Sequence, residues 1–214
     1  DALPISDVWA EDITVEKKFL YFTVLAKEGE SEDFRVNLLG KHNISNILAS
    51  VLVARYLGMS LKEIAQACKK ITESQGPMKL LAGSGGLNIL NASYSANPHG
   101  VAGDLDYLKT RPGRRVIVMP CLIELGRKSK DIHKEIGRKI GEVCDFAIIT
   151  TRERFSEIQE GAQETGMNKG NIIFISNTEE IVRRLEIITV PGDTVLLEGR
   201  VPAGLKERLT NEKS

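Results

Sequence analysis

Three short stretches carry side chains whose types and spacing could bind a ligand. In the first, His42, Asn43 and Asn46 follow Gly40 at the entrance to an apolar, helix-like stretch. Polar side chains and free backbone amides converge at such a helix start, where an anion or a nucleotide can bind. The alternative is a plain helix cap, which the residue types favour when this stretch is taken alone.

The second stretch is an apolar strand that runs into a polar loop. Asn91 lies near the end of the strand, and the loop that follows contains Tyr94, Asn97 and Pro98. Proline is a good first residue of a helix, so we expect a helix to begin there. Loops at the carboxyl ends of parallel strands are where α/β domains place ligands. On its own, an ordinary strand-to-helix connection is the simpler interpretation.

The third stretch combines a carboxylate with a histidine. Glu124 follows the apolar residues 116–119, and His133 comes early in the helix expected next. This order places both side chains over the same sheet edge as the second stretch. The alternative is that His133 is a lone histidine on a solvated helix, which is usually inert.

The elements that position these residues fall into two groups. Residues 1–38 are rich in short strand-like runs, and apolar residues then recur at helical spacing between residues 44 and 57. Ser60 and Glu63 have the spacing of a capping box, which predicts a second helix. The polar residues 72–77, which include Gly-Pro, predict a boundary, so we expect one domain over residues 1–74 and another over 75–214.

After the boundary, strands and helices alternate. Five apolar runs are separated by segments of helical length: residues 87–90, 116–119, 146–149, 172–175 and 195–197. Such alternation indicates parallel strands joined by crossover helices. The fold class is therefore α/β, with a doubly wound sheet in the carboxyl-terminal domain.

Composition excludes several classes of protein. Lysines plus arginines equal aspartates plus glutamates at 29 each, so we expect no nucleic-acid partner. The three cysteines form no C-x-x-C pair and suggest neither a disulfide framework nor a zinc site. No apolar run is long enough to cross a bilayer, so we expect a cytoplasmic chain without a membrane partner. Because the sequence opens on Asp1, we also expect it to be part of something longer.

Taken together, the three stretches resemble the Mur ligase family. G-x-H-N-x-x-N at residues 40–46, Tyr-Ser-Ala-Asn-Pro at 94–98, and Glu-Leu-Gly at 124–126 followed by His133 occur in the family's order and are similar to its MurF branch. The resemblance implies that residues 1–74 are the tail of a central, ATP-binding domain. Residues 75–214 would then be the Rossmann-like carboxyl-terminal domain.

The resemblance also implies roles for the residues in these stretches. His42, Asn43, Asn46 and Asn91 would lie near the nucleotide. The residues implied to lie near the substrate are Tyr94, Asn97, Pro98, Glu124 and His133.

Enzymes of this family use ATP and Mg²⁺ to join an amine, such as D-Ala-D-Ala, to a UDP-muramyl peptide of the cell wall. The sequence contains no G-x-x-x-x-G-K-[ST] loop, so we expect this chain alone to hold no cofactor and to be inactive. The resemblance leaves the catalytic residues unidentified and implies no metal ligand in the chain. The folylpolyglutamate and cyanophycin-type relatives lack the tyrosine loop and rank lower.

Four positions depart from the family pattern. Pro77 replaces an arginine, Asn91 one of two paired acids, and Cys121 an aspartate, while Glu198 inverts the charge of a lysine. Losing such groups removes charge-assisted hydrogen bonds of about 1.5 to 3 kcal/mol each. These departures leave open an alternative, namely a non-catalytic binding or scaffold protein derived from the family.

Overall fold

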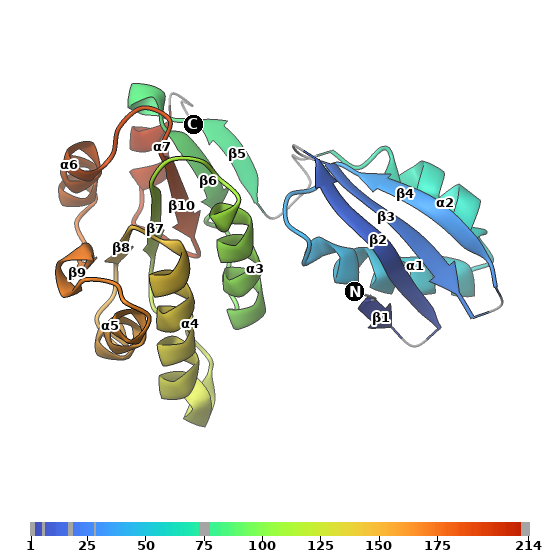
Figure 1. The fold of residues 1–214 in the computed structure, drawn as a ribbon, viewed down its shortest axis with the longest axis horizontal. Coiled ribbons are helices and arrows are strands. Elements are labelled where there is room, and N and C mark those ends of the chain that lie inside the picture. Colours follow the sequence, from blue (N-terminus) through green and yellow to red (C-terminus); the bar gives the residue numbers. More distant parts are fainter. Residues whose placement is uncertain (1–2, 6, 17–18, 28, 73–77, 211–214) are drawn as a thin grey trace. The chain divides into compact units, whose positions relative to one another are not determined.

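A computed structural model describes residues 3–5, 7–16, 19–27, 29–72 and 78–210 (Figure 1). The chain divides into two compact units, Asp1–Gly76 and Pro77–Ser214. The predicted boundary at residues 72–77 and the departure at Pro77 fall almost wholly outside the described residues.

The first unit is a four-stranded antiparallel sheet with two helices on one face. Its strands follow the order β1-β2-β3-β4. Their bounds are Leu3–Ile5, Val8–Glu16, Phe19–Ala26 and Ser31–Val36, and the helices are α1 (Asn43–Tyr56) and α2 (Leu61–Cys68).

Alternation of apolar residues explains why this sheet buries one face. Along β3 every second residue is buried, from Leu20 to Ala26. Phe22 stacks on Phe34 of β4, with ring centroids 5.5 Å apart, and both belong to the core beneath α1 and α2. The predicted capping box is confirmed, because Ser60 accepts from the Glu63 amide and the Glu63 carboxylate accepts from the Ser60 amide.

The second unit is a six-stranded sheet between two layers of helices. Its strand order is β5-β6-β10-β7-β8-β9, and only β5 is antiparallel to its neighbour. The strands are β5 (Lys79–Ala82), β6 (Asn88–Ala92), β7 (Arg115–Met119), β8 (Phe146–Ile149), β9 (Ile172–Phe174) and β10 (Thr194–Glu198). The predicted α/β class with a mostly parallel sheet is confirmed.

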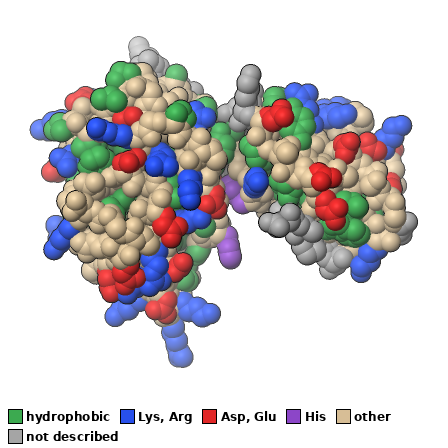
Figure 2. Space-filling model, viewed as in Figure 1, with side chains coloured by type: hydrophobic (Ala, Val, Ile, Leu, Met, Phe, Trp, Pro, Cys, Tyr) green, Lys and Arg blue, Asp and Glu red, His purple; other side chains and the backbone are tan. Residues whose placement is uncertain are grey.

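The helices divide between the two faces as right-handed crossovers require. One set of helices follows along one face, and a second set packs against the core on the other face (Figure 1). The first set is α3 (Pro98–Lys109), α4 (Ser129–Val143) and α5 (Phe155–Glu164), and the second is α6 (Thr178–Ile188) and α7 (Leu205–Leu209). Basic and acidic side chains are interspersed on the face of this unit that Figure 2 shows.

Helices α4 and α5 approach so closely that only glycine fits between them. A Cβ built on Gly161 would lie 2.0 Å from the Lys134 carbonyl oxygen, and one on Gly137 would lie 2.2 Å from the Ile158 carbonyl oxygen. Both obstacles are backbone atoms, so neither can move aside without shifting a helix. The small residues therefore set the distance between these helices.

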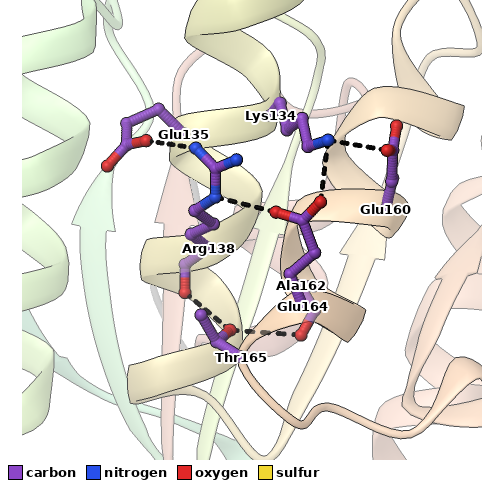
Figure 3. A network of polar contacts seen from close by, with 7 residues as sticks. All are labelled: Lys134, Glu135, Arg138, Glu160, Ala162, Glu164 and Thr165. Carbon is purple, nitrogen blue, oxygen red and sulfur yellow. Dashed lines mark hydrogen bonds and ion pairs between the residues drawn. The ribbon is translucent and has the colours of Figure 1, made fainter.

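A network of ion pairs spans the exposed side of the same interface (Figure 3). Glu164 lies between two cations, 2.7 Å from Lys134 Nζ and 2.9 Å from Arg138 Nε. Hydrogen bonds from Lys134 and Arg138 lower the pKa of Glu164. These side chains are 28–39% exposed, so solvent screens the ion pairs and each contributes little to the free energy of unfolding.

Candidate functional site

Four loops meet at the carboxyl edge of the parallel sheet. They follow β6, β10, β7 and β8, at residues 93–97, 199–204, 120–125 and 150–154. Gly199 holds the first three together, since its amide donates to the Ala92 carbonyl at 3.1 Å. A Cβ on Gly199, whose φ is +65°, would lie 3.0 Å from Ala96 Cβ and 3.5 Å from Pro120. Because β10 lies between β6 and β7, these loops form one continuous edge.

The loop after β6 is organised by side-chain bonds to its own backbone. Asn91 Oδ1 accepts from the Ser93 amide at 3.2 Å and from its hydroxyl at 2.5 Å. Asn97 caps α3 by accepting from the Gly100 amide at 2.9 Å, and Pro98 is the first residue of that helix, as predicted. Tyr94 projects from the tip of the loop with 88% of its surface exposed. The loop is thus a preorganised platform that presents one aromatic side chain.

The loop after β7 presents an exposed carboxylate in an uncommon backbone conformation. Glu124 has a φ of +62°, in the left-handed region that residues with a Cβ rarely adopt. Ile123 beside it is 69% exposed. Because α/β domains place ligands at the carboxyl ends of parallel strands, Glu124 is a candidate for contact with a ligand.

His133 does not lie on a solvated helix face, so the alternative of a histidine on a solvated helix does not describe it. Its side chain is fully buried at the start of α4. Nε2 accepts from the Leu122 amide at 2.9 Å, and Nδ1 faces the Ser129 carbonyl at 2.6 Å. Since both ring nitrogens contact backbone groups, the His133 side chain joins the start of α4 to the loop after β7.

A buried pair of carboxyl groups, which the motifs did not reveal, lies under the same edge. Glu198, the last residue of β10, is 1% exposed and shares a hydrogen bond with Asp104 of α3, which is 6% exposed. Burial, with the repulsion of the neighbouring Asp104 carboxyl, raises the pKa of Glu198 to about 10. One sign of Asp104 was present in the sequence, because it interrupts the apolar stripe formed by Val101, Leu105 and Leu108 of α3.

The first unit holds the remaining predicted residues in a separate cluster at the start of α1. Asn43 is buried, and its Nδ2 donates to the Leu39 carbonyl at 2.7 Å and lies 3.2 Å from His42 Nε2. Asn46, which is exposed, donates to Asn43 Oδ1 at 3.3 Å. Gly40 has a φ of +85°, and a Cβ there would lie 2.5 Å from the His42 ring. The three side chains therefore form one hydrogen-bonded chain that ends at the surface.

The structure thus groups the predicted residues by unit. Asn91, Tyr94, Asn97, Pro98 and Glu124 belong to the loop edge of the second unit, with His133 beneath it.

Two further observations concern the described residues alone. Over these parts of the chain, no three His, Cys, Asp or Glu side chains gather closely enough to hold a metal ion. Nor does any helix there have the length and apolar character that crossing a membrane requires.

Comparison with known families gives two matches, one in each unit. The family described as Mur ligase, glutamate ligase domain, matches residues 77–201. The Mur ligase middle domain matches residues 2–54.

Individual relatives agree with these matches. UDP-N-acetylmuramoyl-tripeptide–D-alanyl-D-alanine ligase from Escherichia coli (strain K12) is 30% identical over 94% of this chain and 43% of its own length. The enzyme of the same name from Bacillus subtilis (strain 168) is 22% identical over 94% of this chain and 44% of its length. The chain therefore spans less than half the length of the curated relatives that it matches.

Solved structures show the same fold. A crystal structure of MurF from Acinetobacter baumannii has a TM-score of 0.74 and 23% identity, over 91% of this chain and 42% of that one. MurF from Thermotoga maritima, solved in complex with ADP, has a TM-score of 0.70 and 22% identity, over 94% of this chain and 46% of that one.

Proposed function

Since this chain belongs to the Mur ligase family, we propose that it is the carboxyl-terminal part of an ATP-dependent ligase of peptidoglycan precursor synthesis, of the MurF type. The observation that carries the proposal is the match of the glutamate ligase domain to residues 77–201. MurF enzymes among its relatives support the MurF branch. Residues 1–74 are proposed as the tail of the central, ATP-binding domain and 75–214 as the carboxyl-terminal domain.

The proposed reaction forms one amide bond. ATP with Mg²⁺ phosphorylates the terminal carboxylate of a UDP-muramyl peptide, and the amine of D-Ala-D-Ala then displaces inorganic phosphate with loss of a proton. The phosphate-binding loop that this requires is absent from the sequence, so the chain by itself is proposed to be inactive. Its contribution is to hold the amine where attack is effectively unimolecular.

The loop edge of the second unit is proposed to hold that amine substrate. Tyr94 offers an exposed aromatic face, and Glu124 offers a carboxylate that is complementary to the ammonium group of a zwitterionic dipeptide. Asn97 and Pro98 fix the loop by starting α3. His133 belongs to this site through the loop to which it is hydrogen-bonded.

The nucleotide is proposed to lie against the cluster of His42, Asn43 and Asn46. The chain of hydrogen bonds through these three side chains supports the proposal, because it leaves Asn46 at the surface as the group nearest a ligand. Asn43 is already bonded to the backbone and would orient its neighbours. The reaction is proposed to take place in the cytoplasm.

One observation favours a second candidate function. Glu198 occupies the place of a lysine in the family pattern, and it is buried against another acid rather than offered to a phosphate. A binding or scaffold protein that has lost catalysis would tolerate this change. Such a protein would bind the peptide or dipeptide without hydrolysing ATP.

The gene upstream of the codon for Asp1 distinguishes these functions. An in-frame G-x-x-x-x-G-K-[ST] loop supports the ligase, because that loop holds the phosphates of ATP. A reading frame that starts near Asp1 would remove the ligase proposal for this protein and leave the binding role.

A further inference from the structure

The loop after β7 is held by side chains that belong to other elements. The Cys121 amide donates to Thr151 Oγ1 at 2.8 Å, from the loop after β8. The Leu122 amide donates to His133 Nε2 at 2.9 Å, from α4. Two successive backbone amides are therefore fixed from outside, just before the exposed residues Ile123 and Glu124.

The geometry of the His133 ring selects one neutral tautomer. Nε2 receives an N–H from Leu122, so it must carry a lone pair. Nδ1 lies 2.6 Å from the Ser129 carbonyl oxygen, so it must carry the proton and donate. A second link fixes Ser129 itself, because Arg154 Nε donates to its hydroxyl at 3.2 Å. The ring is thus a rigid connection between the start of α4 and the loop.

Glu124 needs such a connection because its backbone conformation is unfavourable. A residue with a Cβ in the left-handed region persists only where the surrounding structure imposes that conformation. The bond from Leu122 to His133 lies two residues before Glu124 and is buried, whereas Glu124 itself is exposed. The anchor is therefore placed where it can determine the direction of the carboxylate.

We propose that His133 is a positioning residue, which fixes the loop of residues 121–125 and aims the Glu124 carboxylate at the ammonium group of the amine substrate. The positioning of the loop stands on the contacts of this chain alone. The identity of the ligand rests on the function proposed above, so the positioning of the loop and the binding of the ligand are tested separately.

The tautomer of His133 is the first test and requires no substitution. Ring ¹⁵N chemical shifts of the labelled chain distinguish a protonated Nδ1 from a protonated Nε2. We expect the proton on Nδ1. A proton on Nε2 would overturn the proposal, because that nitrogen could not accept from Leu122.

The second test measures amide hydrogen exchange in His133→Phe, which fills a similar volume without an acceptor. We expect exchange at residues 121–125 to rise at least about tenfold, since one hydrogen bond is lost. His133→Gln, whose side-chain oxygen can accept, should restore part of the protection. Ile136→Val is the matched control, because Ile136 is buried in the same helix but its conservative change leaves the loop contacts in place.

The outcomes are unambiguous even if a variant folds poorly. Unchanged loop exchange in a folded His133→Phe, or an equal rise in Ile136→Val, would overturn the proposal. If His133→Phe does not fold, His133→Gln and the tautomer decide it.

A dipeptide titration followed by NMR tests the ligand. If D-Ala-D-Ala binds, His133→Phe should weaken binding at least about tenfold and Ile136→Val should not. An equal loss of dipeptide affinity in both variants would refute the claim that His133 aims the Glu124 carboxylate. If the dipeptide does not bind the unaltered chain, the role in presenting the amine fails, while the exchange and tautomer results still decide the positioning.

Discussion

Replacing Glu198 by glutamine should make the second unit more stable above neutral pH. In the folded chain Glu198 is 1% exposed beside Asp104, and burial and that neighbour raise its pKa to about 10. In the unfolded chain its pKa returns to the ordinary value of 4.5. Between these values the folded chain keeps a proton that the unfolded chain releases. Glu198 therefore leaves the free energy of unfolding at its full value below pH 4.5 and lowers it progressively as the pH rises towards 10.

The size of the loss in unfolding free energy follows from the difference in the number of protons bound by the folded and unfolded chains. A difference of one bound proton changes the free energy of unfolding by about 1.4 kcal/mol per pH unit. Between pH 6 and pH 8 the free energy of unfolding of the unaltered chain should fall by about 2 to 3 kcal/mol because of the Glu198–Asp104 pair. Glutamine has nearly the same shape, carries no charge and can donate to Asp104, so Glu198→Gln should lose much less.

Urea unfolding at several pH values measures this difference. Far-UV circular dichroism follows both units, whereas the fluorescence of Trp9, the one tryptophan in the sequence, reports the first unit and serves as an internal control. All other residues are common to both proteins, so their contributions cancel in the comparison. Glu186→Gln is the matched control, because Glu186 is exposed on α6 and should leave the pH dependence unchanged.

Two results would refute this reasoning. One is a pH dependence in Glu198→Gln as steep as in the unaltered chain. The other is a flattening of similar size in Glu186→Gln, since that would show a general effect of charge.

Three further predictions concern stability. Gly161→Ala should lower the free energy of unfolding by at least about 2 kcal/mol, because its Cβ would meet the Lys134 carbonyl. Gly170 has open space around it, so Gly170→Ala should change the free energy of unfolding by less than about 0.5 kcal/mol. Equal shifts of the two melting temperatures would contradict this prediction. Asn97→Ala should cost about 1 kcal/mol by removing the cap of α3, and Asn97→Asp should restore most of it in urea titrations. Ser60→Ala should cost about 1 kcal/mol in the first unit, seen by tryptophan fluorescence, and an unshifted midpoint would argue against the capping box.

Most of the architecture could be predicted because the pattern of each element is local. Alternating strands and helices identified the parallel sheet, and the spacing of Ser60 and Glu63 identified a helix start. The strand order could not be predicted, since the place of β10 depends on its pairing with residues 106 positions away in β6 and 79 positions away in β7. The short edge strand β5 was missed for a related reason, because it is defined by its pairing with β6 rather than by its own four residues.

The candidate site was predictable in position but not in detail. Motif order placed Tyr94 and Glu124 on loops at the edge of the sheet. It did not reveal that His133 is buried, because the residues that cover it come from other elements. The inverted charge at Glu198 and the interruption of the apolar stripe of α3 by Asp104 were both visible in the sequence, but the contact between the two side chains became apparent only in the structure.

The most direct test of the ligase proposal is an assay of the protein encoded by the complete gene. It should be mixed with ATP, Mg²⁺, UDP-N-acetylmuramoyl-tripeptide and D-Ala-D-Ala, and ADP release and the new amide product should be measured together. We predict ADP formation that depends on both the peptide and the dipeptide, with one amide bond formed per ATP consumed. Binding of either substrate without ADP release or amide product would contradict the ligase and support the binding protein.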